Sequence, residues 1–159
     1  MELKQNDMKV LEGLLLINGT DIYKEYGVFL CERKSGEFSN YEELLKPALT
    51  KGQTEVDFPE RDGVELPSTL NVTLQAKDIK VYFAICAPDK ETYFTNFGNF
   101  FKFLRTGKNG WLTFDLPEIN RTFKLHYEGS EDFEQLTPLK NGGVGSRFHL
   151  KFREPKPLY

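Results

Sequence analysis

Residues 79–127 constrain the fold more than any other part of the sequence, because they read as strand, helix, strand, strand. Residues 79–87 are β-branched and aromatic, which predicts a strand ended by the following Pro-Asp pair. Residues 91–105 change to a three- and four-residue apolar period, which predicts a helix. Two alternating runs, 111–116 and 120–126, are separated by Pro-Glu and predict a hairpin.

The predicted helix has signals at both ends and one strongly aromatic face. Asp89 can cap its first turn, and Gly107 stands where a C-terminal stop belongs. Burial of each Phe is worth roughly 1.5–3 kcal/mol, so we expect this face to pack on a sheet rather than to form a ligand-binding aromatic box. The residues expected on the packed face are Tyr93, Phe97, Phe100, Phe101 and Leu104.

Other alternating or apolar runs predict a mainly β fold. We expect strands at 14–17, on both sides of a tight turn within 22–30, at 69–74 and at 144–152, and a turn at 128–130. The last strand should place Phe148, Leu150 and Phe152 on one face, with Arg147, His149 and Lys151 turned to solvent. The predicted fold is a β-sandwich or split barrel with one packed aromatic helix and a protruding arm.

The arm is predicted at about 32–67, where Glu, Lys, Gly and Ser are frequent and the apolar residues are widely spaced. Only residues 41–45 suggest a helical turn. An irregular segment of this length is uncommon unless it has a function, and contact with a neighbouring subunit is one such function. The candidate contact residues are Phe38, Tyr41, Leu44, Leu45, Val56, Phe58, Arg61 and Asp62.

Composition excludes several classes of protein. The chain has 159 residues, enough for one domain with a core, of which 28% are charged. The formal net charge is −3 and no basic stripe is present, so sequence-specific nucleic-acid binding is not expected. No apolar run approaches the roughly 20 residues of a membrane span, so no membrane segment is expected.

The sequence offers no recognisable catalytic, metal or nucleotide motif, so we predict a non-enzyme without a cofactor. His126 and His149 are the only histidines, and Cys31 and Cys86 form no CxxC pair. Two free, buried thiols are the favoured interpretation of the cysteines, and a disulfide between them stays open.

Two alternative hypotheses attach to particular side chains. Asp57, Glu60 and Asp62 are close in sequence and could serve a hydrolase or hold a cation, although acids beside a Pro turn are ordinary. Trp111, with Tyr93 or Tyr127, could form a sugar platform of a monomeric carbohydrate-binding β-sandwich, although a lone Trp opening a strand is more often a core or interface residue.

The order of motifs resembles the N-terminal domain of the distal tail protein of siphophages, in the phage tail-component family. The matching segments are LLINGTDIYKEYGVFL at 15–30, FPERDGVEL at 58–66, the helix end and hairpin at 100–129, and the closing aromatic strand with Glu-Pro-Lys-Pro at 147–157. Each motif is weak alone, and their order and spacing carry the resemblance.

The resemblance implies a structural component of a phage or prophage tail. By that resemblance the chain would form a hexameric ring between tail-tube and tail-tip proteins, in the virion tail and, during assembly, the host cytoplasm. The genome would pass through the ring. A role as a tail-tube or tube-terminator protein is a closely related alternative. Many family members carry a second, carbohydrate-binding-like domain, which is not expected in residues 1–159.

Overall fold

The computed structural model describes residues 11–34, 36–139 and 142–159. Its strands form a seven-stranded sheet in the order β2-β1-β5-β6-β7-β4-β3, in which neighbouring strands are antiparallel. The strands are β1 (Leu16–Ile17), β2 (Thr20–Asp21), β3 (Val28–Leu30), β4 (Lys77–Ala87), β5 (Trp111–Leu116), β6 (Arg121–Gln135) and β7 (Val144–Glu154). The helices are α2 (Ile22–Tyr26), α3 (Ser39–Leu45) and α4 (Lys90–Thr106).

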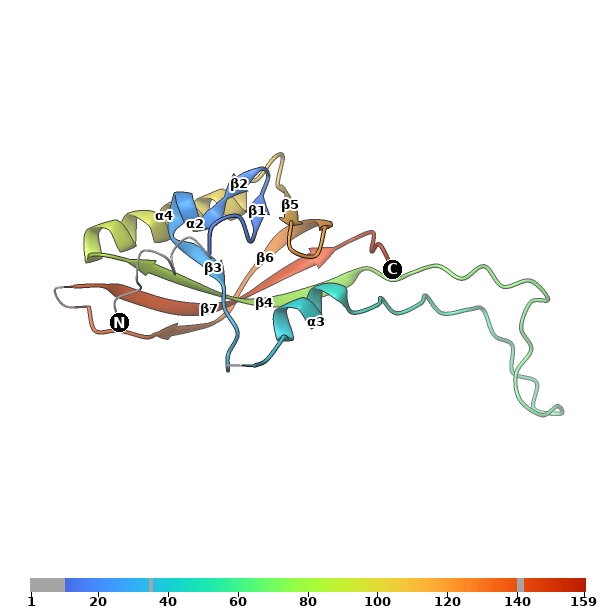
Figure 1. The fold of residues 1–159 in the computed structure, drawn as a ribbon. Coiled ribbons are helices and arrows are strands. Elements are labelled where there is room, and N and C mark those ends of the chain that lie inside the picture. The colour runs from blue at the N-terminus through green and yellow to red at the C-terminus, as the bar shows by residue number, and fades with distance from the viewer. Residues whose placement is uncertain (1–10, 35, 140–141) are drawn as a thin grey trace.

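The predicted fold class is confirmed: the described chain is mainly β, with an aromatic helix on the sheet and a protruding arm. Figure 1 shows α4 lying along one face of the sheet, while the arm leaves the sheet at one end. The strands belong to one twisted sheet, and the predicted hairpin is formed by β5 and β6, which pair from Trp111↔His126 to Leu116↔Arg121.

The centre of the sheet is the ladder between β4 and β7, which are paired along their whole length of 11 residues each. Alternate side chains point to the face under α4, and those of both strands are buried there. Pairs across the ladder on this face are Ile79↔Phe152, Val81↔Leu150 and Phe83↔Phe148. The apolar face predicted for the last strand is therefore confirmed.

Helix α4 begins and ends where the sequence predicts. The Asp89 carboxylate accepts a hydrogen bond from the Thr92 N–H at 2.8 Å, and the Gly107 N–H donates to the Phe103 carbonyl at 2.8 Å. The predicted face packs on the sheet: Tyr93, Phe100 and Leu104 are buried, while Phe97 and Phe101 are half-buried against the same cluster. The buried Tyr93 hydroxyl is satisfied by the Ser146 hydroxyl, 2.7 Å away.

The predicted strand before the tight turn in 22–30 is wrong, because residues 22–26 form helix α2. The Asp21 side chain caps this helix by accepting from the Tyr23 N–H at 3.1 Å. Gly27 ends it in the left-handed conformation, with φ of 67°. A Cβ at Gly27 would lie 2.5 Å from the Cys86 carbonyl oxygen, so glycine is required by both its φ and its neighbour.

Two further local predictions are wrong. The turn expected at 128–130 is part of β6, which continues along β7 to Gln135 through two register shifts, with Gly129 at φ 131° absorbing one of them. Residues 69–74 form no strand, since within the described chain their only bridge is Thr50↔Leu74. The alternating pattern of 69–74 is present, but no strand of the same chain lies beside it.

The two cysteines are free thiols. Cys31 is half-buried, but Cys86 is exposed, contrary to the expectation that both are buried. The reason is the alternation of β4: Ile85 and Ala87 point into the core, so Cys86 between them points to the other face.

The packing of α4 gives a first testable prediction. Phe100→Ala removes a side chain with 0% exposure from between α4 and the sheet, and should lower the free energy of unfolding by about 3–5 kcal/mol. The matched variant Phe94→Ala changes an exposed ring on the same helix and should stay within about 0.5 kcal/mol of the unmodified chain. Chemical denaturation of both variants makes the comparison, and equal losses would contradict the described face of α4.

Candidate self-association surface

The protruding arm consists of residues 46–76, between α3 and β4 (Figure 1). Its outgoing and returning halves run side by side, joined by isolated bridges at Thr50↔Leu74 and Val56↔Glu65. From residue 51 to residue 75 every residue is exposed except Gln53, which is half-buried. The arm therefore makes almost no packing contact with the domain that carries it.

Large apolar side chains are exposed along the whole arm. Their exposed fractions range from 36% at Leu74 to 74% at Leu49. The set is Leu49, Val56, Phe58, Val64, Leu66, Leu70, Val72 and Leu74. Ordering an extended backbone costs about 1–2 kcal/mol per residue, and burial within the same chain does not offset that cost here. An apolar surface of this extent is typical of a segment that packs on a partner.

Five of the eight predicted contact residues lie on this arm or are exposed beside α3. Val56, Phe58, Arg61 and Asp62 are exposed near the arm's tip, and Phe38 is 66% exposed just before α3. The Arg61 guanidinium lies 5.2 Å from the centroid of the Phe58 ring and 3.4 Å from a Glu65 carboxylate oxygen. These side chains are accessible to a neighbouring chain.

The other predicted contact residues lie on α3, which packs on its own sheet. Leu44 has 0% exposure, so it is a core residue and presents no surface to a neighbour. Leu45 and Tyr41 are half-buried against the same core. The Tyr41 hydroxyl donates to Glu118 at 2.6 Å, and burial together with this bond raises the pKa of Tyr41 to about 12. The protruding part thus begins at 46 and ends at 76, rather than spanning 32–67.

Asn40 fixes α3 to the sheet, and no local pattern in the sequence singles it out. Its side-chain oxygen accepts from the Tyr82 N–H at 2.8 Å, and its amide nitrogen donates to the carbonyls of Tyr82 and Cys31. The Glu32 carboxylate accepts from the Asn40 N–H at 3.0 Å and from the Ser39 hydroxyl. These bonds pair the open side of β4 with α3.

The root of the arm contains two buried ionisable side chains, Lys77 and Glu154. The Lys77 ammonium donates to the Leu44 carbonyl at 2.8 Å, and Lys77 stands opposite Glu154 in the β4–β7 ladder. Burial raises the pKa of Glu154 and lowers that of Lys77, and the attraction between the two groups opposes both shifts. One carboxylate oxygen of Glu154 is buried without a hydrogen-bond partner. The Ala48 N–H also donates to the Tyr159 carbonyl at 3.1 Å.

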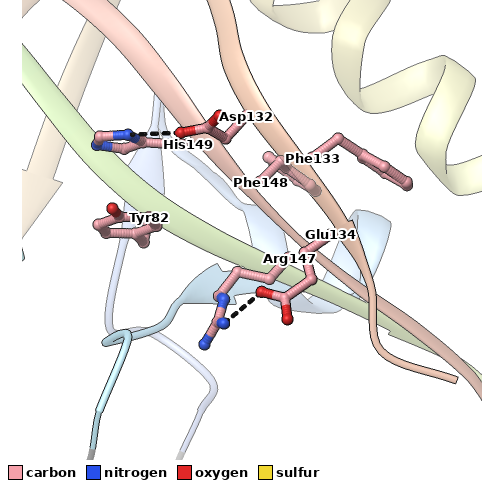
Figure 2. A pocket seen from close by; sticks show the side chains of 7 residues that line it. All are labelled: Tyr82, Asp132, Phe133, Glu134, Arg147, Phe148 and His149. Carbon is pink, nitrogen blue, oxygen red and sulfur yellow. Dashed lines mark hydrogen bonds and ion pairs between the residues drawn. The ribbon is translucent and has the colours of Figure 1, made fainter.

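The face of the sheet opposite α4 carries a small open hollow (Figure 2). The His149 ring stacks on Tyr82 with a centroid distance of 3.9 Å, so its side chain is only 14% exposed and the predicted solvent-facing position is wrong. Its Nδ1 lies 4.0 Å from an Asp132 carboxylate oxygen. The hollow is lined by Tyr82, Asp132, Phe133, Glu134, Arg147, Phe148 and His149, which include no hydroxyl or thiol nucleophile of the Ser or Cys type.

The residues of the alternative hypotheses are placed as follows. Asp57, Glu60 and Asp62 are all exposed on the arm. Within the described residues, no group of three or more His, Cys, Asp and Glu side chains is arranged to hold a metal ion. Trp111 is 36% exposed, with the Lys124 ammonium 4.7 Å from its ring centroid and His126 at its edge. No described helix has the length and apolarity needed to cross a membrane.

Comparison with known proteins gives a likeness of fold. No protein-family model matches the chain, and no curated protein sequence matches it. Among solved structures, the fold is similar to that of SPP1 Dit (gp 19.1), described as a paradigm of the hub adsorption apparatus in phages that infect Gram-positive bacteria. The TM-score is 0.58 at 12% identity, over 91% of this chain and 50% of that one, so the chain spans about half its length.

The arm root gives a prediction on pH. Because the pKa of folded Glu154 lies above its ordinary value of 4.5, the folded chain keeps a proton that the unfolded chain releases. The contribution of Glu154 to stability is therefore full below that value and is lost as pH rises through the raised pKa. Relative to Glu154→Gln, the unmodified chain should lose free energy of unfolding as pH rises above the ordinary value of 4.5 and through the raised pKa of folded Glu154.

Chemical denaturation across this pH range measures the difference. Glu60→Gln changes an exposed carboxylate on the arm and serves as the matched control. Parallel curves for the unmodified chain and Glu154→Gln would show that the folded environment does not favour the protonated form of Glu154.

Proposed function

We propose that this chain is a structural subunit of a phage or prophage tail, which associates with copies of itself into a ring at the hub between tail tube and tip and performs no catalysis. The observation that carries the proposal is the arm, which exposes apolar side chains along its length and makes almost no packing contact with its own domain. The similarity of fold to a phage hub protein supports it.

The position of the arm favours a ring over a two-fold dimer. The arm emerges where β4 begins and β7 ends, at one end of the sheet, and points away from it (Figure 1). An arm that meets a different surface of the next copy makes a head-to-tail contact. Such contacts close into rings when the rotation between copies divides a full turn. The hexameric state is taken from the resemblance of the sequence to the distal tail family.

Removal of the arm tests the proposal. In the variant, residues 51–73 are replaced by two glycines, which can close the gap because Thr50 and Leu74 already form a bridge. Light scattering coupled to size exclusion should give about six chains per particle for the full chain and one for the variant. The midpoint of thermal unfolding of the variant at low concentration should stay near that of the full chain, since the arm adds no core residue.

The matched control keeps the arm but scrambles the order of residues 51–73, so that its length, charge and apolar content are unchanged. This chain should fail to form the ring. A ring that survives the scrambling would mean non-specific adhesion, and a ring that survives removal of the arm would refute the arm's role. A full chain that stays monomeric at every concentration tested would count against self-association itself.

A further inference from the structure

The second half of β6 is an open edge of the sheet. Strand β5 pairs with β6 only as far as His126, whereas β7 pairs with β6 up to Gln135. Within the described residues, nothing pairs with residues 128–135 on the side away from β7. Register shifts between Tyr127 and Asp132 turn the strand away from β5. An edge of this kind presents free N–H and C=O groups to a further strand.

An apolar strip lies beside this edge, between β6 and α4. Phe133 is 53% exposed and meets Phe97 edge-to-face with a centroid distance of 5.9 Å. Phe94 on the outer side of α4 is 56% exposed. Figure 2 shows the Phe133 side chain directed toward the helix rather than to the charged face of the sheet. We call Phe94, Phe97 and Phe133 the α4–β6 seam.

The returning half of the arm has the pattern that such an edge requires. Leu70, Val72 and Leu74 alternate with polar residues over 69–74 and are all exposed, with Val72 at 64%. The alternation in this run predicts a strand, yet the run pairs with no strand among the residues that the structure describes. Strand addition combines main-chain hydrogen bonds with apolar contacts at every second residue.

We propose that residues 69–74 of one copy add as a strand to the edge 128–135 of β6 in the next copy, with their apolar side chains on the α4–β6 seam. The proposal rests on the self-association argued under Proposed function, and it names the surface that receives the arm. The contact is a β-strand addition between two copies of this chain.

The distribution of charged side chains favours the returning half of the arm, rather than its tip, as the added strand. The edge carries Glu128, Glu131, Asp132 and Glu134, whereas residues 66–76 contain no charged side chain. Three of the edge acids, Glu128, Glu131 and Glu134, pair with cations of the same chain. The tip, residues 55–65, has five acids and one arginine, so it meets the edge less favourably than the neutral half does. Lys51 lies on the adjacent half of the arm, where its N–H donates to the Thr73 carbonyl at 2.8 Å, so a cation accompanies the neutral strand.

The arm leaves one end of the sheet, whereas the edge runs from the middle of the sheet toward its other end. Lys77↔Glu154 closes the ladder at the arm's root, and Ala87↔Val144 closes it at the other end, near Gln135↔Ser146. Eleven paired residues span about 35 Å, and the arm points away from the sheet (Figure 1). The arm is thus directed toward a second copy, and the resulting contact is head-to-tail.

Hydrogen exchange of backbone amides measures directly whether the proposed strand pairing forms. At a concentration where light scattering shows the oligomer, amides in 69–74 and in 128–135 should exchange at least about tenfold more slowly than at dilutions that give monomers. The amides of β3, at the other margin of the sheet, are the internal control and should keep their rates. Unchanged exchange in 128–135 within a proven oligomer would overturn this proposal and leave self-association standing.

Two proline variants separate strand addition from simple apolar adhesion. Val72→Pro removes an N–H inside the proposed strand and should abolish the oligomer, while Val64→Pro changes an exposed apolar residue of the arm outside it and should retain the oligomer. Equal behaviour of the two variants would refute the assigned strand. Protection of 128–135 that persists in an arm-less monomer and disappears on removal of residues 1–10 would assign the edge to the chain's own N-terminal segment and also refute it.

Discussion

The ladder between β4 and β7 is the interaction on which the rest of the structure depends. Its 11 residue pairs provide the floor on which Tyr93, Phe100 and Leu104 of α4 are buried. Its outer strand, β4, receives Asn40 and thereby α3. Its end, at Lys77 and Glu154, holds the arm's root. Damage to this ladder would affect the core, the anchoring of α3 and the direction of the arm together.

The two faces of this ladder have opposite character because side chains alternate along each strand. Under α4 the face is aromatic and buried, and it supplies the free energy of folding. The opposite face carries ion pairs between strands, among them Lys80–Glu131 at 3.1 Å and Arg153–Asp78 at 2.8 Å. Exposed pairs of this kind contribute about 0–1 kcal/mol each, so they mainly keep this face soluble and fix the register.

Elements with complete local signals were predictable from the sequence. Helix α4 has an apolar period over its length, a capping Asp89 and a terminal Gly107, and the β5–β6 hairpin has alternation on both sides of Pro117. Helix α2 was missed because five residues give no period, and only the cap at Asp21 and the left-handed Gly27 define it. The continuation of β6 past Gly129 depends on pairing with β7, which no local pattern records.

The candidate surface was predictable only in part. The existence of an arm follows from composition, because widely spaced apolar residues cannot build a core. The first and last residues of the arm do not follow from composition. Leu44 lies in the core because α3 packs on β4, which is distant from it in sequence. The alternation at 69–74 is a local strand pattern, but no strand forms there, because no described strand pairs with these residues. A sequence pattern indicates the tendency to form a strand, but it does not indicate which strand pairs with it.

An open edge and an exposed apolar arm in one molecule create a hazard of irregular aggregation. The distribution of charge limits it. Two β6 edges that approach each other bring Glu131 and Glu134 against the same acids, and two arm tips do the same with Asp57 and Asp62. The pairing without this repulsion is that of the neutral returning half of the arm with the acidic edge. The acids thus disfavour symmetric contacts of arm with arm and of edge with edge, which agrees with the proposed head-to-tail contact.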